Sequence, residues 1–272
     1  MELAVSSIAW TSEEETAVAE TLQRLGVRNV ELALTKIWED PTKVGYEEAQ
    51  KVVKWWEGYG INVVAVQSML FSRPDLKIFE DQNNRQECYE YLEKFIILAG
   101  MMGIKRMVFG SPKNRQKGLL SNEAADAIAV GFFTDLANVA RKNNVVLCIE
   151  PNATQYSCDY VTTAKEGDKL VRRINNDGFG LHLDTACMTL AGDNLKESIN
   201  SSIDIIKHFH ISSPMLEQVD YRKDVDHVSA ASCLRKNNYT GYVSIEMRPG
   251  DNGTNCDRVE KAVNFAKTIY FN

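Results

Sequence analysis

Short apolar runs alternate along the chain with longer stretches in which apolar residues recur at helical spacing. The short runs are rich in Val, Ile and Leu, which is typical of buried strands. We expect these strands to begin near Leu3, Val30, Ile61, Arg106, Val145, Gly180, His208 and Tyr242. The first and last starts are 239 residues apart, so the seven intervals average about 34 residues. One strand–helix–strand unit occupies about 30 residues or more. The pattern therefore predicts eight strand–helix units.

Hydroxyl residues and glycines mark the ends of the predicted helices. Thr11 to Glu15 places a hydroxyl before a run of acidic side chains, as a helix N-terminus favours. Gly26 and Gly103 directly follow helical segments, at the place where a left-handed residue commonly ends a helix. Gly60 and Gly178 each lie just before a predicted strand, so both are also expected at helix ends.

The number and length of these units favour a closed barrel. Eight parallel strands ringed by eight helices take about 250 residues, and the chain has 272. A doubly wound open sheet also alternates strands with helices, but it usually carries a glycine-rich loop after its first strand. Here that strand is followed by Ser6 to Trp10, without a glycine. We therefore predict a single-domain (β/α)8 TIM barrel over residues 1–272.

Composition narrows the partners and the compartment. A hydrophobic share of 44% with 25% charged residues is ordinary for a globular protein. The formal charge of -6 argues against a nucleic-acid binder, which needs surplus cations. Apolar runs such as Ile61 to Val66 are far shorter than the roughly 18 residues of a membrane span, and no basic, apolar leader follows Met1. Six cysteines without a CxxC pair indicate reduced thiols. We expect a cytoplasmic protein with no membrane or nucleic-acid partner.

Four consecutive predicted strands end in residues that can bind a metal. These residues are Glu150, Asp184, His210 and Glu246. In a barrel of this type the active site lies at the C-terminal ends of the strands, so the four side chains are expected to converge. Three carboxylates brought together repel one another unless a cation lies among them.

This donor set also limits which ion is expected. Three carboxylates and one imidazole suit a divalent ion, manganese foremost, with magnesium, cobalt or zinc as alternatives. Each residue taken alone can instead be a helix cap or half of an ion pair. Four such residues in succession, at matching depth, favour one bound metal ion.

Five segments resemble a known family. They are Val108 to Arg115, Cys148 to Asn152, Gly180 to Thr185, His208 to Ser212 and Gly241 to Met247. Over essentially the whole chain the sequence resembles the xylose isomerase-like barrels. That family includes sugar and sugar-phosphate isomerases and epimerases, inosose dehydratases and type-IV endonucleases. The resemblance implies that the four residues above bind one divalent ion, as the matching residues of ketose 3-epimerases do. It also implies that Glu150 and Glu246 transfer protons.

The implied chemistry begins with a metal ion that polarises a substrate carbonyl. A glutamate removes the neighbouring carbon-bound proton, and the metal charge holds the resulting enediolate. The function expected is a divalent-metal-dependent isomerase or epimerase of a small sugar, sugar acid or cyclitol. The alternatives are an inosose-type dehydratase, a lyase that uses the same site, and a non-catalytic sugar-binding barrel. Type-IV endonucleases fit less well, because they need extra histidines and this chain has four. The relatives also imply a possible homo-oligomer.

Two positions depart from the epimerase pattern. Cys187 stands where many epimerases have a histidine that contacts substrate, and Tyr156 stands where they have a second glutamate. Both remain candidate substrate contacts, although a small packing role also suits the cysteine.

Several polar and aromatic residues at the predicted rim are further candidates. Lys113, Arg115 and Arg248 follow strands and are expected to bind substrate, with a solvated loop as the alternative. Trp10, like Phe71, follows a strand and is a candidate wall for a sugar ring, with rim packing as the alternative. Three remaining positions are given structural interpretations: Glu31 as half of an ion pair, and His182 and His208 as interior residues with satisfied hydrogen bonds.

Overall fold

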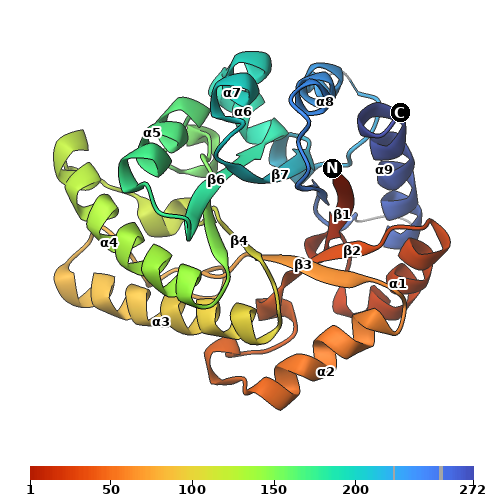
Figure 1. Cartoon of the computed structure of the whole chain (residues 1–272), viewed down its shortest axis with the longest axis horizontal. Coiled ribbons are helices and arrows are strands. Elements are labelled where there is room, and N and C mark those ends of the chain that lie inside the picture. The colour runs from red at the N-terminus through yellow and green to blue at the C-terminus, as the bar shows by residue number, and fades with distance from the viewer. Residues whose placement is uncertain (223, 251–253) are drawn as a thin grey trace.

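The computed structural model describes residues 1–222, 224–250 and 254–272. Eight parallel strands form one closed barrel in chain order, and β8 returns to pair with β1 (Figure 1). The strands are β1 (Glu2–Ser6), β2 (Asn29–Ala33), β3 (Asn62–Gln67), β4 (Arg106–Phe109), β5 (Val146–Ile149), β6 (Phe179–Asp184), β7 (Ile206–Ser212) and β8 (Tyr242–Glu246). The predicted single-domain TIM barrel is confirmed.

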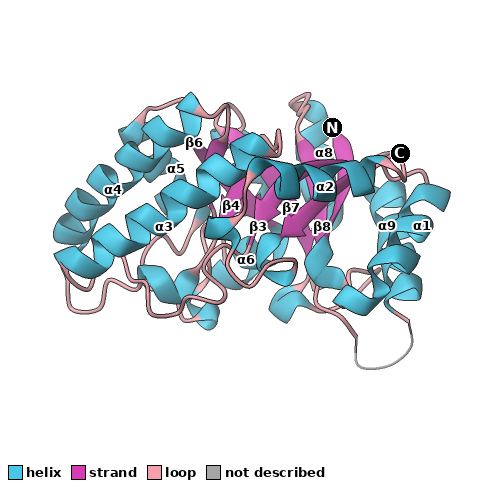
Figure 2. Ribbon diagram, turned by 90° about the horizontal axis from the view of Figure 1, so that it is seen from below, coloured by secondary structure: helices cyan, strands magenta, loops and turns pink. Residues whose placement is uncertain are grey.

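Helices surround the strands on the outside, as the view in Figure 2 shows. In the described ranges they are α1 (Glu15–Arg24), α2 (Tyr46–Glu57), α3 (Gln82–Met101), α4 (Asn122–Lys142), α5 (Ala164–Ile174), α6 (Thr185–Ala191), α7 (Leu195–Ser202), α8 (His227–Lys236) and α9 (Asn255–Tyr270). Two helices, α6 and α7, follow β6, so these ranges hold nine helices and not eight. Within the same ranges, none of them combines the length and apolarity needed to cross a bilayer.

Every strand begins within two residues of its predicted start, but β7 is longer than expected. It runs to Ser212, which pairs in register with Glu246 of β8. His210 therefore lies inside the strand, opposite Ser244, and not at its end. Its side chain still shares the barrel interior with the residues that end the neighbouring strands.

The helix ends largely follow the predicted punctuation. Thr11 and Glu14 form a capping box just before α1, and Gly26, Gly60 and Gly103 all have the positive φ of a left-handed stop. Gly178 differs, because a Cβ there would lie 2.0 Å from a backbone oxygen of α4. It allows close approach of α4 to the start of β6, and it is not a left-handed stop.

The barrel interior near the C-terminal strand ends is polar. Glu31 on β2 contacts His208 and His210 on β7, and these strands are not neighbours, so the contact crosses the interior. Gln67 on β3 likewise donates to the hydroxyl of Ser6 on β1. All five of these side chains are buried. The apolar core lies instead between the strands and the helices.

Candidate metal centre

Four potential metal ligands converge at the C-terminal ends of β5 to β8. Glu150, Asp184, His210 and Glu246 each offer one donor atom, and these atoms lie within 4.8 Å of one another. The Nδ1 atom of His210 is 3.4 Å from Glu246 Oε2 and 3.9 Å from both Glu150 Oε1 and Asp184 Oδ2. The structure thus brings together the four side chains that the strand ends predicted.

Backbone and neighbouring groups orient two of the carboxylates. Asp184 ends β6 and caps α6, because its Oδ1 accepts from the Cys187 backbone N–H at 2.6 Å. Its Oδ2 accepts from the Ser212 hydroxyl of β7. Glu150 follows β5 directly, and its Oε2 accepts from the amide of Asn152 at 3.0 Å. Two donors therefore hold the carboxylate of Asp184, and one holds that of Glu150.

Glu31 orients the imidazole of His210. Its Oε2 lies 2.9 Å from His210 Nε2, and both side chains are fully buried. Burial alone would raise the pKa of Glu31, but His210 and His208 outweigh it and hold that pKa well below its usual range. An N–H at Nε2 that donates to Glu31 leaves Nδ1, which has no hydrogen-bond partner in the described part of the chain, turned toward the three carboxylates. A carboxylate behind a metal-binding histidine commonly fixes its ring in this way. Glu31 thus has the contacts expected of an ion-pair partner, and these contacts join opposite charges when an imidazole is protonated.

The carboxylates of the cluster oppose one another's ionisation. Burial, with the charges of Glu150 and Glu246, raises the pKa of Asp184 to about 7. Burial also raises the pKa of Glu246, although His210 acts in the opposite direction. All three carboxylates are therefore not readily ionised together at neutral pH without added positive charge. Three carboxylates and one unpaired imidazole nitrogen fit a divalent cation.

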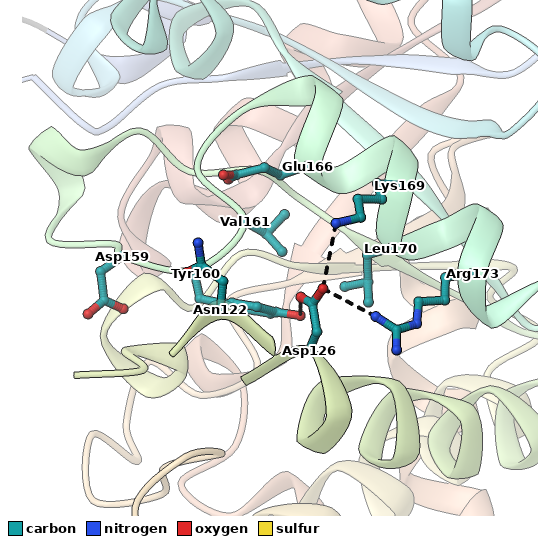
Figure 3. Close-up of a pocket in the computed structure, with 9 residues that line it drawn as sticks. All are labelled: Asn122, Asp126, Asp159, Tyr160, Val161, Glu166, Lys169, Leu170 and Arg173. Atoms are coloured by element: carbon teal, nitrogen blue, oxygen red, sulfur yellow. Dashed lines mark hydrogen bonds and ion pairs between the residues drawn. The ribbon is translucent and has the colours of Figure 1, made fainter. Parts of the chain in front are cut away.

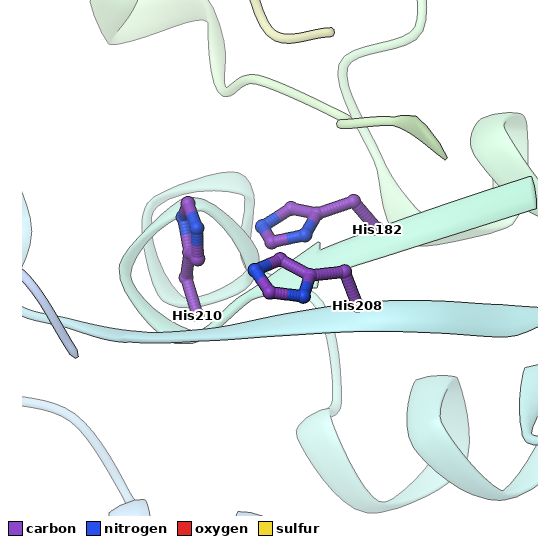
Figure 4. Close-up of side chains that lie close together, drawn as sticks. All are labelled: His182, His208 and His210. Atoms are coloured by element: carbon purple, nitrogen blue, oxygen red, sulfur yellow. The ribbon is translucent and has the colours of Figure 1, made fainter. Parts of the chain in front are cut away.

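Two further histidines lie beside His210 inside the barrel (Figure 4). The ring centroids of His182 and His210 are 4.1 Å apart, and His208 lies 5.4 Å from each. His208 meets Glu31 through Nε2 at 3.4 Å, whereas neither nitrogen of His182 has a hydrogen-bond partner among the described residues. The prediction of a satisfied His182 is wrong: its Nε2 lies 3.5 Å from Glu150 Oε1 without hydrogen-bond geometry. Burial lowers the pKa of His182 well below its usual value, so the ring is neutral.

Cys187 and Tyr156 lie near the cluster. The Cys187 sulfur is 3.5 Å from the Asn152 amide, and burial together with Asp184 raises the pKa of its thiol well above the usual value. A nucleophilic thiolate is therefore disfavoured. The half-buried Tyr156 accepts from the Met215 backbone N–H at 2.9 Å. Both side chains remain candidate substrate contacts.

Two residues expected to bind substrate are buried and contact only other parts of the chain. Arg115 is fully buried, and its guanidinium donates to four backbone carbonyls and to Asn152. Trp10 is 1% exposed, donates to Glu15 at 2.7 Å and packs against Trp56. Arg115 has no free donor for a substrate, and Trp10 has no exposed face for a sugar ring, so both expectations are corrected.

The other rim candidates are exposed. Arg248 pairs with Glu217 at 2.8 Å. Lys113 lies on a groove of about 340 Å³ with Phe71, whose side chain is 83% exposed. Neither cation contacts the four-residue cluster directly, so a role in substrate binding stays a prediction for both.

A small pocket of about 100 Å³ lies between α4 and α5 (Figure 3). At its centre Asp126 accepts from Tyr160 at 3.1 Å and from Arg173 at 3.2 Å, and Lys169 lies 3.8 Å away. These charged groups satisfy one another. None of the residues that line the pocket belongs to the metal cluster. The contacts of Asp126 in the pocket hold α4 against α5.

Sequence reasoning gave no role to three residues that contact the cluster. Asn152 and Ser212 each donate to one of its carboxylates. A Cβ on Gly110 would lie 2.3 Å from Glu150 Oε2, so glycine leaves room for that carboxylate in its present position. A signal was available for Asn152 and Ser212, since both are polar and lie two residues after a predicted ligand. Nothing comparable marked Gly110.

The structure is thus a closed parallel barrel with a cluster of potential metal ligands at its C-terminal face. The model of the xylose isomerase-like TIM barrel family matches residues 19–269, and the chain belongs to that family. A comparison with curated proteins gave no match.

Solved structures share the fold over almost the full chain. An L-ribulose 3-epimerase has a TM-score of 0.84 at 16% identity, covering 100% of this chain and 95% of that one. D-psicose 3-epimerase from Clostridium cellulolyticum H10, with D-tagatose, has a TM-score of 0.82 at 14% identity, covering 99% of both chains. The IolI protein with a bound zinc atom has a TM-score of 0.79 at 17% identity, covering 99% and 98%.

Proposed function

We propose that this chain is a divalent-metal-dependent isomerase or epimerase of a small sugar, sugar acid or cyclitol. The observation that carries the proposal is the pair Glu150 and Glu246, which meet in one cluster with Asp184 and His210 between them in strand order. The epimerases of similar fold act on ketoses, and the IolI structure holds zinc, which supports a sugar substrate and a metal.

The four cluster residues would hold the ion, since their donor set suits a divalent cation. When bound, that ion supplies Lewis-acid polarisation of a substrate carbonyl. The remaining chemistry belongs to the two glutamates. One takes the proton from the carbon beside the carbonyl, and the other returns a proton to the opposite face, which inverts that carbon. Burial raises the pKa of Glu246 above its ordinary value, which favours the protonated form of this carboxyl.

The same two carboxyls support other outcomes. Return of the proton to the neighbouring carbon moves the carbonyl, and loss of a β-hydroxyl gives dehydration. The dehydratase and the non-catalytic sugar-binding barrel remain the alternatives. The presence of both glutamates in the cluster favours catalysis over binding alone.

Most cations at the rim are already engaged, which argues against a phosphorylated substrate; Lys113 is the exposed exception. Phosphate is usually held by arginine forks or by backbone amides. Arg115 is buried on carbonyl groups, and Lys36 donates to the backbone oxygens of Ser7 and Trp10. Arg248 is paired with Glu217. We therefore propose an unphosphorylated substrate.

The test is exchange of carbon-bound hydrogen with deuterated water. A panel of ketoses and cyclitols, with phosphorylated counterparts, is incubated with the chain with and without Mn²⁺. We expect metal-dependent exchange, faster with the unphosphorylated compounds, and inversion at the exchanged carbon. Release of water with formation of an ultraviolet-absorbing enone would indicate the dehydratase instead.

Glu246→Gln tests the assigned role, because it keeps the shape of the side chain and removes the proton acceptor. We expect exchange to fall by about 100-fold or more, since general-base catalysis contributes about 10² to 10⁴. The matched control is Glu260→Gln, which breaks an exposed ion pair with Arg24 and should leave exchange unchanged. Exchange by E246Q at the unaltered rate would contradict the assignment.

A further inference from the structure

Arg115 is a buried cation without a carboxylate partner. It ends a short 3-10 turn, Pro112–Arg115, that follows β4, and it is fully buried. No ion pair involves it in the part of the chain that the structure describes. Its nitrogens donate to Gly110 O at 2.8 Å, Tyr160 O at 2.7 Å, Val161 O at 3.1 Å, Glu150 O at 2.6 Å and Asn152 Oδ1 at 2.7 Å. A buried charge needs such a full set of hydrogen bonds to be tolerated.

The contact with Asn152 determines which way that amide faces. A guanidinium only donates, so the carbonyl oxygen of Asn152 must face Arg115. The NH₂ group is thereby turned to Glu150, where it donates to Oε2 at 3.0 Å. Arg115 thus selects the amide orientation that presents a donor to the carboxylate.

Both the backbone and the carboxylate of Glu150 are held in place near Arg115. Its backbone oxygen accepts from Arg115, and its Oε2 lies between the Asn152 amide and the space that glycine leaves at position 110. Oε1 is then left facing His210 Nδ1, at 3.9 Å. The Arg115–Asn152 pair therefore fixes the orientation of the Glu150 carboxylate, so that one oxygen accepts from Asn152 and the other faces the remaining ligands.

The same pair holds an unusual backbone conformation in the loop after β5. Val161 has φ +57°, a region that β-branched residues rarely adopt. Its carbonyl accepts from Arg115 and from the Asn152 backbone N–H, the latter at 3.2 Å. Strain of this kind persists only where surrounding contacts enforce it. The loop has a separate attachment in Gln116, which donates to Ser157 O at 2.8 Å without touching Glu150.

We propose that Arg115 is a positioning residue: it orients the Asn152 amide, which fixes the Glu150 carboxylate for metal binding and proton transfer. This inference rests on the proposed function, because it assigns Glu150 those two roles. Arg115 acts through Asn152 and through the β5 backbone and does not touch substrate.

The test compares Arg115→Lys and Asn152→Ala with Gln116→Ala. Lysine keeps the charge but cannot make the five contacts of the guanidinium. Alanine at position 152 removes the donor to Glu150 together with one of the five acceptors of Arg115, whose four contacts with backbone oxygens remain. Gln116→Ala is the matched control, since it loosens the same loop and leaves the carboxylate alone. Two measurements are made: the Mn²⁺ dissociation constant by calorimetry without substrate, and kcat and KM for deuterium exchange.

We expect R115K and N152A to weaken Mn²⁺ binding and to lower kcat by about 10- to 100-fold each, as loss of a group that orients a ligand commonly does. KM should stay within about threefold, since the substrate contacts are intact. The double variant should be little worse than the worse single variant, because the two residues act in one chain of contacts. Q116A should match the wild type.

The outcomes separate this inference from the proposed function. A wild-type chain that binds Mn²⁺ but exchanges no hydrogen contradicts the proposed reaction, and the dissociation constants then decide the positioning role. A wild type that binds no Mn²⁺ overturns both. Variants N152A and R115K that bind Mn²⁺ and turn over within twofold of an active wild type overturn this inference alone. If R115K does not fold, the Mn²⁺ dissociation constant and kcat of N152A alone test the inference.

Discussion

Gly110→Ala is the smallest change that should displace a ligand without disturbing the barrel. Gly110 directly follows β4, and its φ lies outside the left-handed region, so the backbone accepts alanine. The added Cβ would lie 2.3 Å from Glu150 Oε2 and 3.3 Å from Asn152 Oδ1. The substitution therefore acts on the Glu150 carboxylate.

The size of the effect follows from that contact. Ordinary van der Waals contact begins at 3.4 Å, so Oε2 must retreat by about 1.1 Å. Misplacement of a catalytic group by about 1 Å can lower a rate about 100-fold. Overpacking costs typically about 1 to 3 kcal/mol, which is less than the stability of most domains. We expect exchange to fall by about 100-fold in a chain that remains folded.

The assay is metal-dependent deuterium exchange, with thermal unfolding measured on the same samples. The matched control is Gly131→Ala on the exposed side of α4, where a Cβ meets nothing within 4 Å. That change should raise the free energy of unfolding by about 0.5 to 1 kcal/mol and leave exchange unaltered. A folded G110A variant with the wild-type exchange rate would refute the argument that the position of the Glu150 carboxylate limits the reaction.

Two further predictions concern metal affinity and pH. Glu31→Gln removes the charge behind His210 and should weaken Mn²⁺ binding by about 10- to 100-fold, measured by calorimetry; an unaltered dissociation constant would contradict the role given to Glu31. The second concerns Asp184, whose folded-state pKa of about 7 lies above the ordinary 3.8. Between about pH 4 and pH 7 the folded metal-free chain therefore keeps a proton on Asp184 that the unfolded chain has already lost. Stability from this proton is fully present below pH 4 and is lost as pH rises through 7. Thermal melts should show that Mn²⁺ stabilises the chain more at pH 8 than at pH 5. Equal stabilisation at the two pH values would contradict the raised pKa of Asp184.

The strands were predictable because a parallel strand buried on both faces is a nearly continuous apolar run. Val145 to Ile149 is such a run, and it ends at a glutamate. Barrel topology then places every strand end at one mouth, so Glu150, Asp184 and Glu246 could be grouped from sequence alone. His210 was grouped correctly although β7 continues beyond it, because residues two apart on a strand face the same side.

The place of Arg115 could not be predicted, because it depends on a turn. Ser111 has φ +45°, and the 3-10 turn that follows it buries the arginine. A cation after a strand looks the same in sequence whether it faces solvent or lies buried. The partners of the barrel histidines were equally hidden, since Glu31 and His210 are 179 residues apart. Only the closed barrel brings them together.

The charges inside the barrel connect the raised pKa values of two carboxyls with the proposed metal site. Four carboxylates are buried or nearly buried there: Glu31, Glu150, Asp184 and Glu246. Glu31 is matched by His210, and the charge of Arg115 lies one amide away from Glu150. Asp184 and Glu246 share His210 with Glu31, and the pKa of both is still raised. These two carboxylates are neutralised either by protons or by one divalent ion. A chain that binds the ion should therefore release protons as it does so, which links metal affinity to pH through the same residues that carry the proposed reaction.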